Sequence, residues 1–422
     1  MKIAHIADAH LGYRQYKKAE REEDIFLAFK AAIDVAIEKE VRIFLIAGDL
    51  FHKRTVNPKT LLRAQEEIQR LVDLGITPIV IEGNHERQLR FGEESWASYI
   101  GRTSGIFLQT HLGKHGVEYT PYDATTGTGA YYEVDNVRFT GMGYYGASTG
   151  DAVRGLVKAL EGSTLSHLEA HVVLLHAGHM DIMGGYGGGI SSAVVALLNP
   201  YCDYLALGHL HKPYSIDGWV HNPGSLEVIN RLEAEWPDRG VLIWDTAVGR
   251  EPIRVPIKSR RKFLTINYDV SKETSVAAAT ANLADGIKAS ATGLLSGTTF
   301  PPVVTVTLSG VYHFTPAHIP TSVVEDVVKK ELNPLYVSIK NEAVPVELAN
   351  FSNGSEKVSR KEVETQVLMQ LVSRDAKMEK HTDAWVGHIQ DLLQMANEGK
   401  PDPERVIEEL ERFVDRISPT KE

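Results

Sequence analysis

Five short apolar runs of this chain each end in side chains of the kinds that bind metal ions. Runs of this length, bounded by glycine or polar residues, are typical of buried strands. Binding sites in open α/β sheets form at the carboxyl ends of the strands, so residues placed there are expected to converge. The side chains concerned are Asp8, His10, Asp49, Asn84, His176, His209 and His211. The pattern therefore predicts an α/β fold with one metal centre at its strand ends.

The chemistry of this set indicates which metals it would hold. It combines carboxylate and amide oxygens with imidazole nitrogens and contains no cysteine. Such a mixture suits manganese, iron or zinc, whereas an all-oxygen site would favour magnesium or calcium. Two divalent ions about 3.5–4 Å apart repel each other and need an anionic bridge, for which Asp49 is the best candidate. Water held by two such ions loses a proton near neutral pH and can attack phosphorus, which indicates a two-metal phosphoesterase centre.

Three further histidines lie close to these blocks. His85 directly follows Asn84, and His52 lies three residues after Asp49; neither is needed as a ligand. An oxygen leaving phosphorus needs a proton, so His85 is the candidate acid or phosphate-binding cation. His179 could replace His176 as a ligand, but we favour His176 because it directly ends the apolar run.

The motifs resemble those of the calcineurin-like metallophosphoesterase superfamily. They are Asp8-x-His10, Gly48-Asp49, Gly83-Asn84-His85-Glu86 and Gly208-His209-x-His211. Within the superfamily, the chain is similar to DNA double-strand-break repair nucleases of the SbcD and meiotic-recombination-eleven type, in particular their archaeal-type members. That narrower resemblance rests on His10-Leu11-Gly12-Tyr13, Gly48-Asp49-Leu50-Phe51-His52 and Pro223-Gly224-Ser225-Leu226-Glu227. Glu86 stands where these nucleases usually have aspartate and where phosphatases of the superfamily use glutamate.

The resemblance implies a metallophosphoesterase β-sandwich flanked by helices, with two Mn²⁺ ions per chain. One ion would be bound by Asp8, His10, Asp49 and His211, and the other by Asp49, Asn84, His176 and His209. His85 would assist catalysis, and His52 would help to place the DNA strand. The implied activity is that of a 3′-to-5′ exonuclease and single-strand endonuclease on double-strand ends and single-stranded DNA. The implied assembly is a homodimer working with a coiled-coil, SMC-like ATPase of the SbcC type.

Two alternatives share the same fold. The first is another phosphoesterase of the superfamily, such as a cyclic-nucleotide diesterase or a protein phosphatase. His52 and the additional domains argue against it. The second is a mainly structural subunit that tethers DNA ends, and the complete set of metal ligands argues against that.

The composition bears on substrate and location. A formal net charge of -10 is unusual for an enzyme that acts on DNA, because non-specific affinity comes largely from cations that contact phosphates. Local cations would have to supply that contact, and the candidates are Lys53, Arg54, Arg87, Arg90 and the cluster from Lys258 to Lys262. The single cysteine excludes an intrachain disulfide, and no apolar run approaches the ~18 residues of a membrane span. We therefore expect a cytoplasmic, nucleoid-associated protein, or a nuclear one in a eukaryote.

The strand and helix patterns divide the chain into four segments. Residues 1–257 form the expected catalytic domain, and residues 263–345 a small α/β domain that, by resemblance, caps the site and binds DNA. Residues 346–360 are the expected linker, and residues 361–418 form helices.

Two of these C-terminal helices carry apolar stripes at helical spacing. One stripe consists of Trp385, Ile389, Leu392, Leu393 and Ala396, and the other of Val406, Ile407, Leu410 and Phe413. The stripes are compatible with a hairpin that packs on itself, or with a module that docks onto a partner helix or coiled coil. By resemblance, that partner would be the ATPase.

Overall fold

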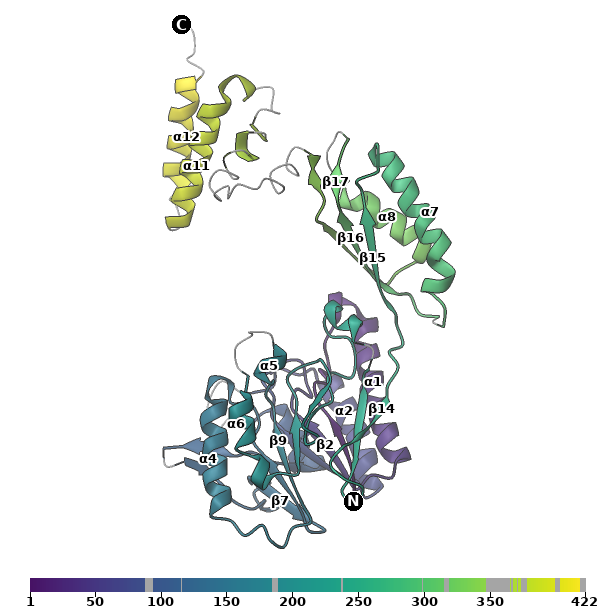
Figure 1. Ribbon diagram of the computed structural model, residues 1–422, viewed down its shortest axis with the longest axis vertical. Helices are drawn as coiled ribbons and strands as arrows, with labels where there is room; N and C mark the ends of the chain where they lie inside the picture. The colour runs from purple at the N-terminus through teal and green to yellow at the C-terminus, as the bar shows by residue number, and fades with distance from the viewer. Residues whose placement is uncertain are drawn as a thin grey trace. The chain divides into compact units, whose positions relative to one another are not determined.

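The structure is a computed structural model. It describes residues 1–87, 94–114, 116–183, 189–236, 238–297, 299–314, 319–346, 365, 367–369, 371–372, 378–398 and 403–417. The chain forms two compact units (Figure 1). The first unit comprises Met1–Phe263 and Gly297–Pro302, and the second comprises Leu264–Ser296 and Val303–Glu422.

Two six-stranded sheets form the framework of the first unit. The first has the order β14-β13-β1-β2-β3-β4, and strands β1 to β4 are parallel. Its strands are β1 (Lys2–Ile6), β2 (Ile43–Ala47), β3 (Thr77–Ile81), β4 (Ile106–Phe107), β13 (Gly240–Asp245) and β14 (Ile253–Pro256). The second has the order β11-β12-β10-β9-β8-β7, with β12, β10, β9 and β8 parallel. Its strands are β7 (Tyr131–Val134), β8 (Val137–Gly141), β9 (Ala170–Leu175), β10 (Tyr204–Leu207), β11 (Tyr214–Ile216) and β12 (Val220–Asn222).

The two sheets share an apolar core because strand residues alternate between two faces. On β2, Ile43, Leu45 and Ala47 lie in the core between the sheets, whereas Phe44 and Ile46 pack towards the helices. Residues of β8, β9 and β10 fill the same core from the second sheet. The expected β-sandwich flanked by helices is therefore confirmed.

Helices cover the outer faces of both sheets (Figure 1). In the first unit they are α1 (Ala19–Glu38), α2 (Pro58–Asp73), α3 (Trp96–Ser104), α4 (Thr149–Glu161), α5 (Met180–Met183) and α6 (Ser192–Ala196). Short 3-10 turns occupy η1 (Gln15–Lys17), η2 (Gly146–Ser148), η3 (Asn199–Tyr201) and η4 (Arg231–Glu235), and β5 (His111–Gly113) pairs with β6 (Gly116–Glu118). The Asn57 side chain caps α2 by accepting from the Lys59 amide, and Pro58 takes the first helical position, as helix-start chemistry favours.

The second unit begins with a small α/β module. A three-stranded sheet has the order β15-β16-β18, and β16 pairs in parallel with β18. The elements are β15 (Phe263–Asp269), α7 (Val276–Leu294), β16 (Val303–Ser309), β17 (Val311–Tyr312), α8 (Thr321–Leu332), β18 (Tyr336–Asn341) and β19 (Val344–Pro345). One apolar core joins α7 and α8 to this sheet, and the expected α/β character of this segment is confirmed.

The C-terminal helices pack against each other. The elements are η5 (Glu379–His381), α11 (Thr382–Glu398) and α12 (Pro403–Ile417). Phe413 of α12 stacks on His388 of α11, with ring centroids 4.2 Å apart, and meets Trp385 edge-on. Residues 347–360 of the expected linker, and most of residues 361–377 of the expected helical segment, lie outside the described residues. Among the helices that the structure describes, none combines the length and the apolar character needed to cross a membrane.

Candidate metal centre

The predicted ligands lie together at the carboxyl ends of five strands. Asp8 and His10 follow β1, Asp49 follows β2 and Asn84 follows β3, whereas His176 follows β9 and the pair His209 and His211 follows β10. The first three strands belong to one sheet and the last two to the other. The centre therefore joins the ends of two sheets, where the sequence pattern alone suggested a single sheet edge.

One group of donors consists of Asp8, His10 and His211. The two imidazoles face each other, with their Nε2 atoms 2.9 Å apart. His211 Nε2 lies 4.0 Å from Asp8 Oδ1, and the Asp8 carboxylate accepts the backbone N–H of His209 at 3.1 and 3.0 Å. These donor atoms lie within 4.8 Å of one another, so a single cation could contact all three residues.

A second group consists of Asn84, His176 and His209. Asn84 Oδ1 lies 3.1 Å from His176 Nε2 and 2.8 Å from His209 Nδ1. Asp49 lies between the two groups, because its Oδ2 is 3.5 Å from His176 Nε2 and 3.8 Å from His10 Nε2. This is the position that a bridging carboxylate requires.

Several of the candidate ligands adopt the left-handed backbone region, which is uncommon for residues other than glycine. The φ angles are 53° at Asp8, 50° at His10, 51° at Asp49 and 83° at His209. Backbone bonds between neighbouring strand ends hold two of these turns: Asp8 N–H donates to Gly48 O, and His10 N–H donates to Asp49 O. Strained backbone conformations of this kind persist where surrounding contacts hold them in place, and they are concentrated at functional sites.

Burial and charge perturb the ionisable groups of the centre. Burial opposes the charge of Asp49, but His176, His10 and His85 outweigh that cost and hold the pKa of Asp49 well below its usual range. Burial also opposes the charge of His176, yet the Asp49 carboxylate raises the pKa of this imidazole to about 9. Burial raises the pKa of Asp8 to about 6 and lowers that of His209 to about 4. A cation bound by His176 would therefore displace a proton at neutral pH.

Two glutamates that the sequence interpretation left without a role hold candidate ligands or the loops that carry them. Glu233 is buried, and its Oε1 accepts from His211 Nδ1 at 2.6 Å, which leaves Nε2 of that ring for a cation. Glu86 is also buried and accepts the N–H groups of Phe51 (2.6 Å) and Gly83 (3.0 Å), thereby joining the loops after β2 and β3. The Asn230-x-x-Glu233 spacing of a capping box could have revealed Glu233, because its carboxylate also accepts the Asn230 N–H.

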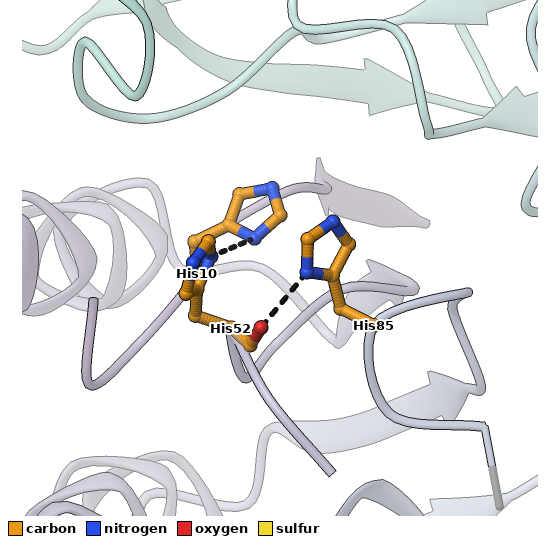
Figure 2. A group of neighbouring side chains, drawn as sticks. All are labelled: His10, His52 and His85. Carbon is orange, nitrogen blue, oxygen red and sulfur yellow. Dashed lines mark hydrogen bonds between the residues drawn. The ribbon is translucent and has the colours of Figure 1, made fainter. Parts of the chain in front are cut away.

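His52 and His85, which the proposed ligand set does not use, lie beside His10 of the first group (Figure 2). Nδ1 of His52 lies 3.3 Å from Nδ1 of His10, so one of these nitrogens donates and the other accepts. His85 Nδ1 donates to the His52 carbonyl at 2.8 Å. The remaining nitrogen of His85, Nε2, therefore faces the centre, 3.9 Å from Asp49 Oδ2.

The structure also locates the alternative ligand and the candidate cations for DNA binding. His179 does not join the donor groups: its Nε2 lies 3.4 Å from Ser192 Oγ, so the structure favours His176 as the ligand. Lys53, Arg54 and Arg87 are exposed, whereas Arg90 lies outside the described residues. Arg54 donates to the Arg87 carbonyl, and Arg87 donates to the Tyr144 carbonyl.

The cationic cluster at the end of the first unit contains a residue that does not fit its expected role. Arg261 is buried and donates to Asp24 at 2.9 Å. The Arg261 guanidinium is therefore paired with a carboxylate inside the protein. The expectation that Arg261 contacts DNA phosphates is wrong.

Comparison with known proteins agrees with this geometry. Residues 1–213 match the family model of the calcineurin-like phosphoesterases. The chain is 30% identical to the DNA double-strand break repair protein Mre11 of Archaeoglobus fulgidus, an alignment that covers 56% of this chain and 52% of that protein. It is 28% identical to Mre11 of Methanocaldococcus jannaschii (56% and 59% covered) and 26% identical to Mre11 of Sulfurisphaera tokodaii (68% and 67% covered). These alignments span about half to two thirds of the length of each relative. Because the family model covers half of the chain and the donors that it contains converge on one centre, the chain belongs to the calcineurin-like phosphoesterase family.

Proposed function

We propose that this chain is a two-metal DNA nuclease of double-strand-break repair, with 3′-to-5′ exonuclease and single-strand endonuclease activity. The observation that carries the proposal is the position of His85 and His52 beside two donor groups that share Asp49. The similarity to Mre11 proteins supports DNA as the substrate. We assign residues 1–257 to the nuclease domain and residues 263–345 to a capping domain that contacts DNA.

The donor set fits two Mn²⁺ ions. It is made of imidazole nitrogens and carboxylate or amide oxygens, the mixture that manganese accepts. Asp8, His10, Asp49 and His211 would hold one ion, and Asp49, Asn84, His176 and His209 the other. When bound, such ions supply Lewis acidity and make water a nucleophile at neutral pH.

The other residues of the centre orient the ligands and supply the proton for the leaving oxygen. Glu233 and the Ala47 carbonyl fix the ring orientations of His211 and His176 through their Nδ1 atoms. His85 uses Nδ1 to hold the His52 carbonyl, so its Nε2 is the atom that can carry a proton towards the substrate. As the water oxygen bonds to phosphorus, the bond to the leaving 3′ or 5′ oxygen breaks, and that oxygen takes the proton from His85 Nε2. The proton released by the water passes to solvent.

Binding of DNA needs cations, and the chain carries a net charge of -10. Lys53, Arg54 and Arg87 are exposed near the strand ends and are our candidates for contacts with phosphates. We propose that a partner supplies the remaining affinity and that the nuclease acts as a homodimer with a coiled-coil, SMC-like ATPase of the SbcC type.

The C-terminal hairpin offers a surface for that ATPase. Phe413 is buried against α11, whereas Ile407, Leu410 and Val414 of α12 remain 57%, 41% and 40% exposed. These three residues recur at helical spacing, so they form one apolar strip that a partner helix could cover.

The test uses 3′-labelled duplex DNA and circular single-stranded DNA with Mn²⁺, and compares the protein with His85→Gln. We expect cleavage of both substrates by the wild type and a loss of roughly 10²–10⁴-fold in the variant, because a proton donor is removed. Binding of Mn²⁺ should persist, since His85 is not among the proposed ligands. If the wild type cleaves neither DNA, even with the ATPase, the nuclease proposal fails. Activity on a cyclic nucleotide or a phosphopeptide would then favour another phosphoesterase, and inactivity on every substrate would favour a subunit that tethers DNA ends.

A further inference from the structure

Tyr13 lies at the outer end of a column of three rings beside the metal centre. Its ring stacks on His52, with centroids 3.8 Å apart and an interplanar angle of 27°. His52 in turn faces His85, with centroids 5.0 Å apart and planes tilted by 31°. His10 meets both imidazoles edge-on, at 5.3 and 4.7 Å. Neither the proposed ligand set nor the proposed acid includes Tyr13.

The column matters because His52 holds His85 in two ways. The His52 ring lies beside the His85 ring, and the His52 carbonyl accepts the His85 Nδ1–H at 2.8 Å (Figure 2). A change in the position of His52 would therefore turn His85 and move its Nε2 relative to the reacting phosphate. Misplacement of a catalytic group by about 1 Å can cost up to about 10²-fold in rate.

Tyr13 is well anchored for the task of holding His52. It packs against the apolar core that α1 and the first sheet share. Its backbone N–H donates to the His10 carbonyl at 3.2 Å, so the ring is tied to the strand end that carries two proposed ligands. One face of His52 is thus supported by a ring that the core itself keeps in place.

We propose that Tyr13 is a positioning residue for the proton donor: it fixes His52, and His52 fixes His85. This inference rests on the proposed function, because it assigns to His85 the transfer of a proton to the leaving oxygen. The tyrosine ring carries the effect through stacking, so phenylalanine can replace it and leucine cannot.

The nature of the leaving group provides a readout that general damage to the fold would not produce. An alkoxide leaving from DNA needs a proton, whereas p-nitrophenolate is a stable anion that leaves bis-p-nitrophenyl phosphate without one. For Tyr13→Leu we expect kcat on DNA to fall on the order of tenfold. On bis-p-nitrophenyl phosphate its kcat should stay within about twofold of the wild type, and KM and Mn²⁺ affinity should be unchanged. Tyr13→Phe should behave as the wild type on both substrates.

A double-mutant cycle with His85→Gln tests the route of the effect. If Tyr13 acts through His85, Tyr13→Leu should cause little further loss once His85 is glutamine. Tyr99→Leu is the matched control, because Tyr99 packs against the same apolar core and its ring contacts Trp96. This control should leave the ratio of the two activities unchanged.

Other outcomes would overturn the inference. They are equal losses on the two substrates, full additivity in the cycle, or wild-type kinetics for Tyr13→Leu. Failure of the wild type on DNA would instead contradict the proposed function. In that case the same series on a cyclic nucleotide, whose leaving oxygen is also an alkoxide, would still test Tyr13.

Discussion

Gly48 immediately precedes the proposed bridging ligand, and its replacement by alanine should damage the centre in two separable ways. Its φ angle is +86°, where a side chain costs about 1–2 kcal/mol. A Cβ at this position would also lie 2.3 Å from Nδ1 of His176, far inside contact distance. That nitrogen donates to the Ala47 carbonyl at 2.7 Å, so the imidazole would have to leave the orientation in which Nε2 faces Asp49.

The size of the steric effect can be isolated with a matched glycine. Gly75 has a φ angle of +76°, and a Cβ there would meet nothing within 4 Å, so Gly75→Ala measures the backbone strain alone. We expect Gly48→Ala to lower the free energy of unfolding by about 1–3 kcal/mol more than Gly75→Ala, the usual cost of overpacking. Displacement of His176 should weaken Mn²⁺ binding by roughly 10–100-fold, as loss of a partner that orients a ligand does.

Two measurements check these values. Thermal unfolding of the metal-free proteins compares their stabilities, and calorimetric titration with Mn²⁺ compares their affinities. Gly75→Ala should bind Mn²⁺ as the wild type does. If Gly48→Ala costs no more stability than Gly75→Ala and also keeps the wild-type affinity, the added methyl group does not displace His176.

Three further predictions concern pH, a ligand partner and the C-terminal hairpin. The pKa of His176 is raised from 6.5 to about 9 by Asp49, and burial raises the pKa of Glu86 from 4.5 to about 8. The contribution of His176 to stability is therefore fully present below pH 6.5 and is lost as the pH rises through 9. That of Glu86 is fully present below pH 4.5 and is lost as the pH rises through 8. The Tm of the metal-free protein should therefore fall between pH 6.5 and 9, and the rise in Tm on adding Mn²⁺ should be larger at pH 9; a flat profile would contradict this. Glu233→Gln should lower Mn²⁺ affinity roughly 10–100-fold in calorimetry, because the amide holds His211 Nδ1–H less strongly, while the exposed Glu235→Gln should not. Phe413→Ala should destabilise the hairpin by about 3–5 kcal/mol, seen as faster amide exchange in α11 and α12, with cleavage of bis-p-nitrophenyl phosphate unchanged.

Much of the fold was predictable because its elements follow local rules. Short continuous apolar runs predicted the strands that carry the proposed ligands. Ile25, Phe29 and Ile33, spaced four residues apart, form the buried face of α1, as helical periodicity requires. The stripe on α11 was predicted less well, since Val386 and His388 are buried there whereas Leu393 is 42% exposed. That side of α11 is chosen by the position of Phe413 on α12, which no local pattern contains.

Local sequence patterns predicted which side chains would meet at the strand ends. Asp49 and Asn84 follow strands that run parallel in one sheet, so their convergence was predictable from strand direction and spacing. Residue types then limited the chemistry to cations that accept both nitrogen and oxygen ligands. These inferences needed only local structure and the general geometry of sheets.

The orientation of the donors depends on contacts between segments that are distant in the sequence. His211 pairs with Glu233, Tyr13 stacks on His52, and Arg261 forms a buried ion pair with Asp24. Each of these contacts joins two segments that local periodicity does not relate. Such contacts depend on how the two sheets and their connecting loops pack around the strand ends. A sequence pattern fixes which face a residue occupies, whereas the three-dimensional packing fixes its partner, and at this centre the partner determines which nitrogen of each imidazole is available.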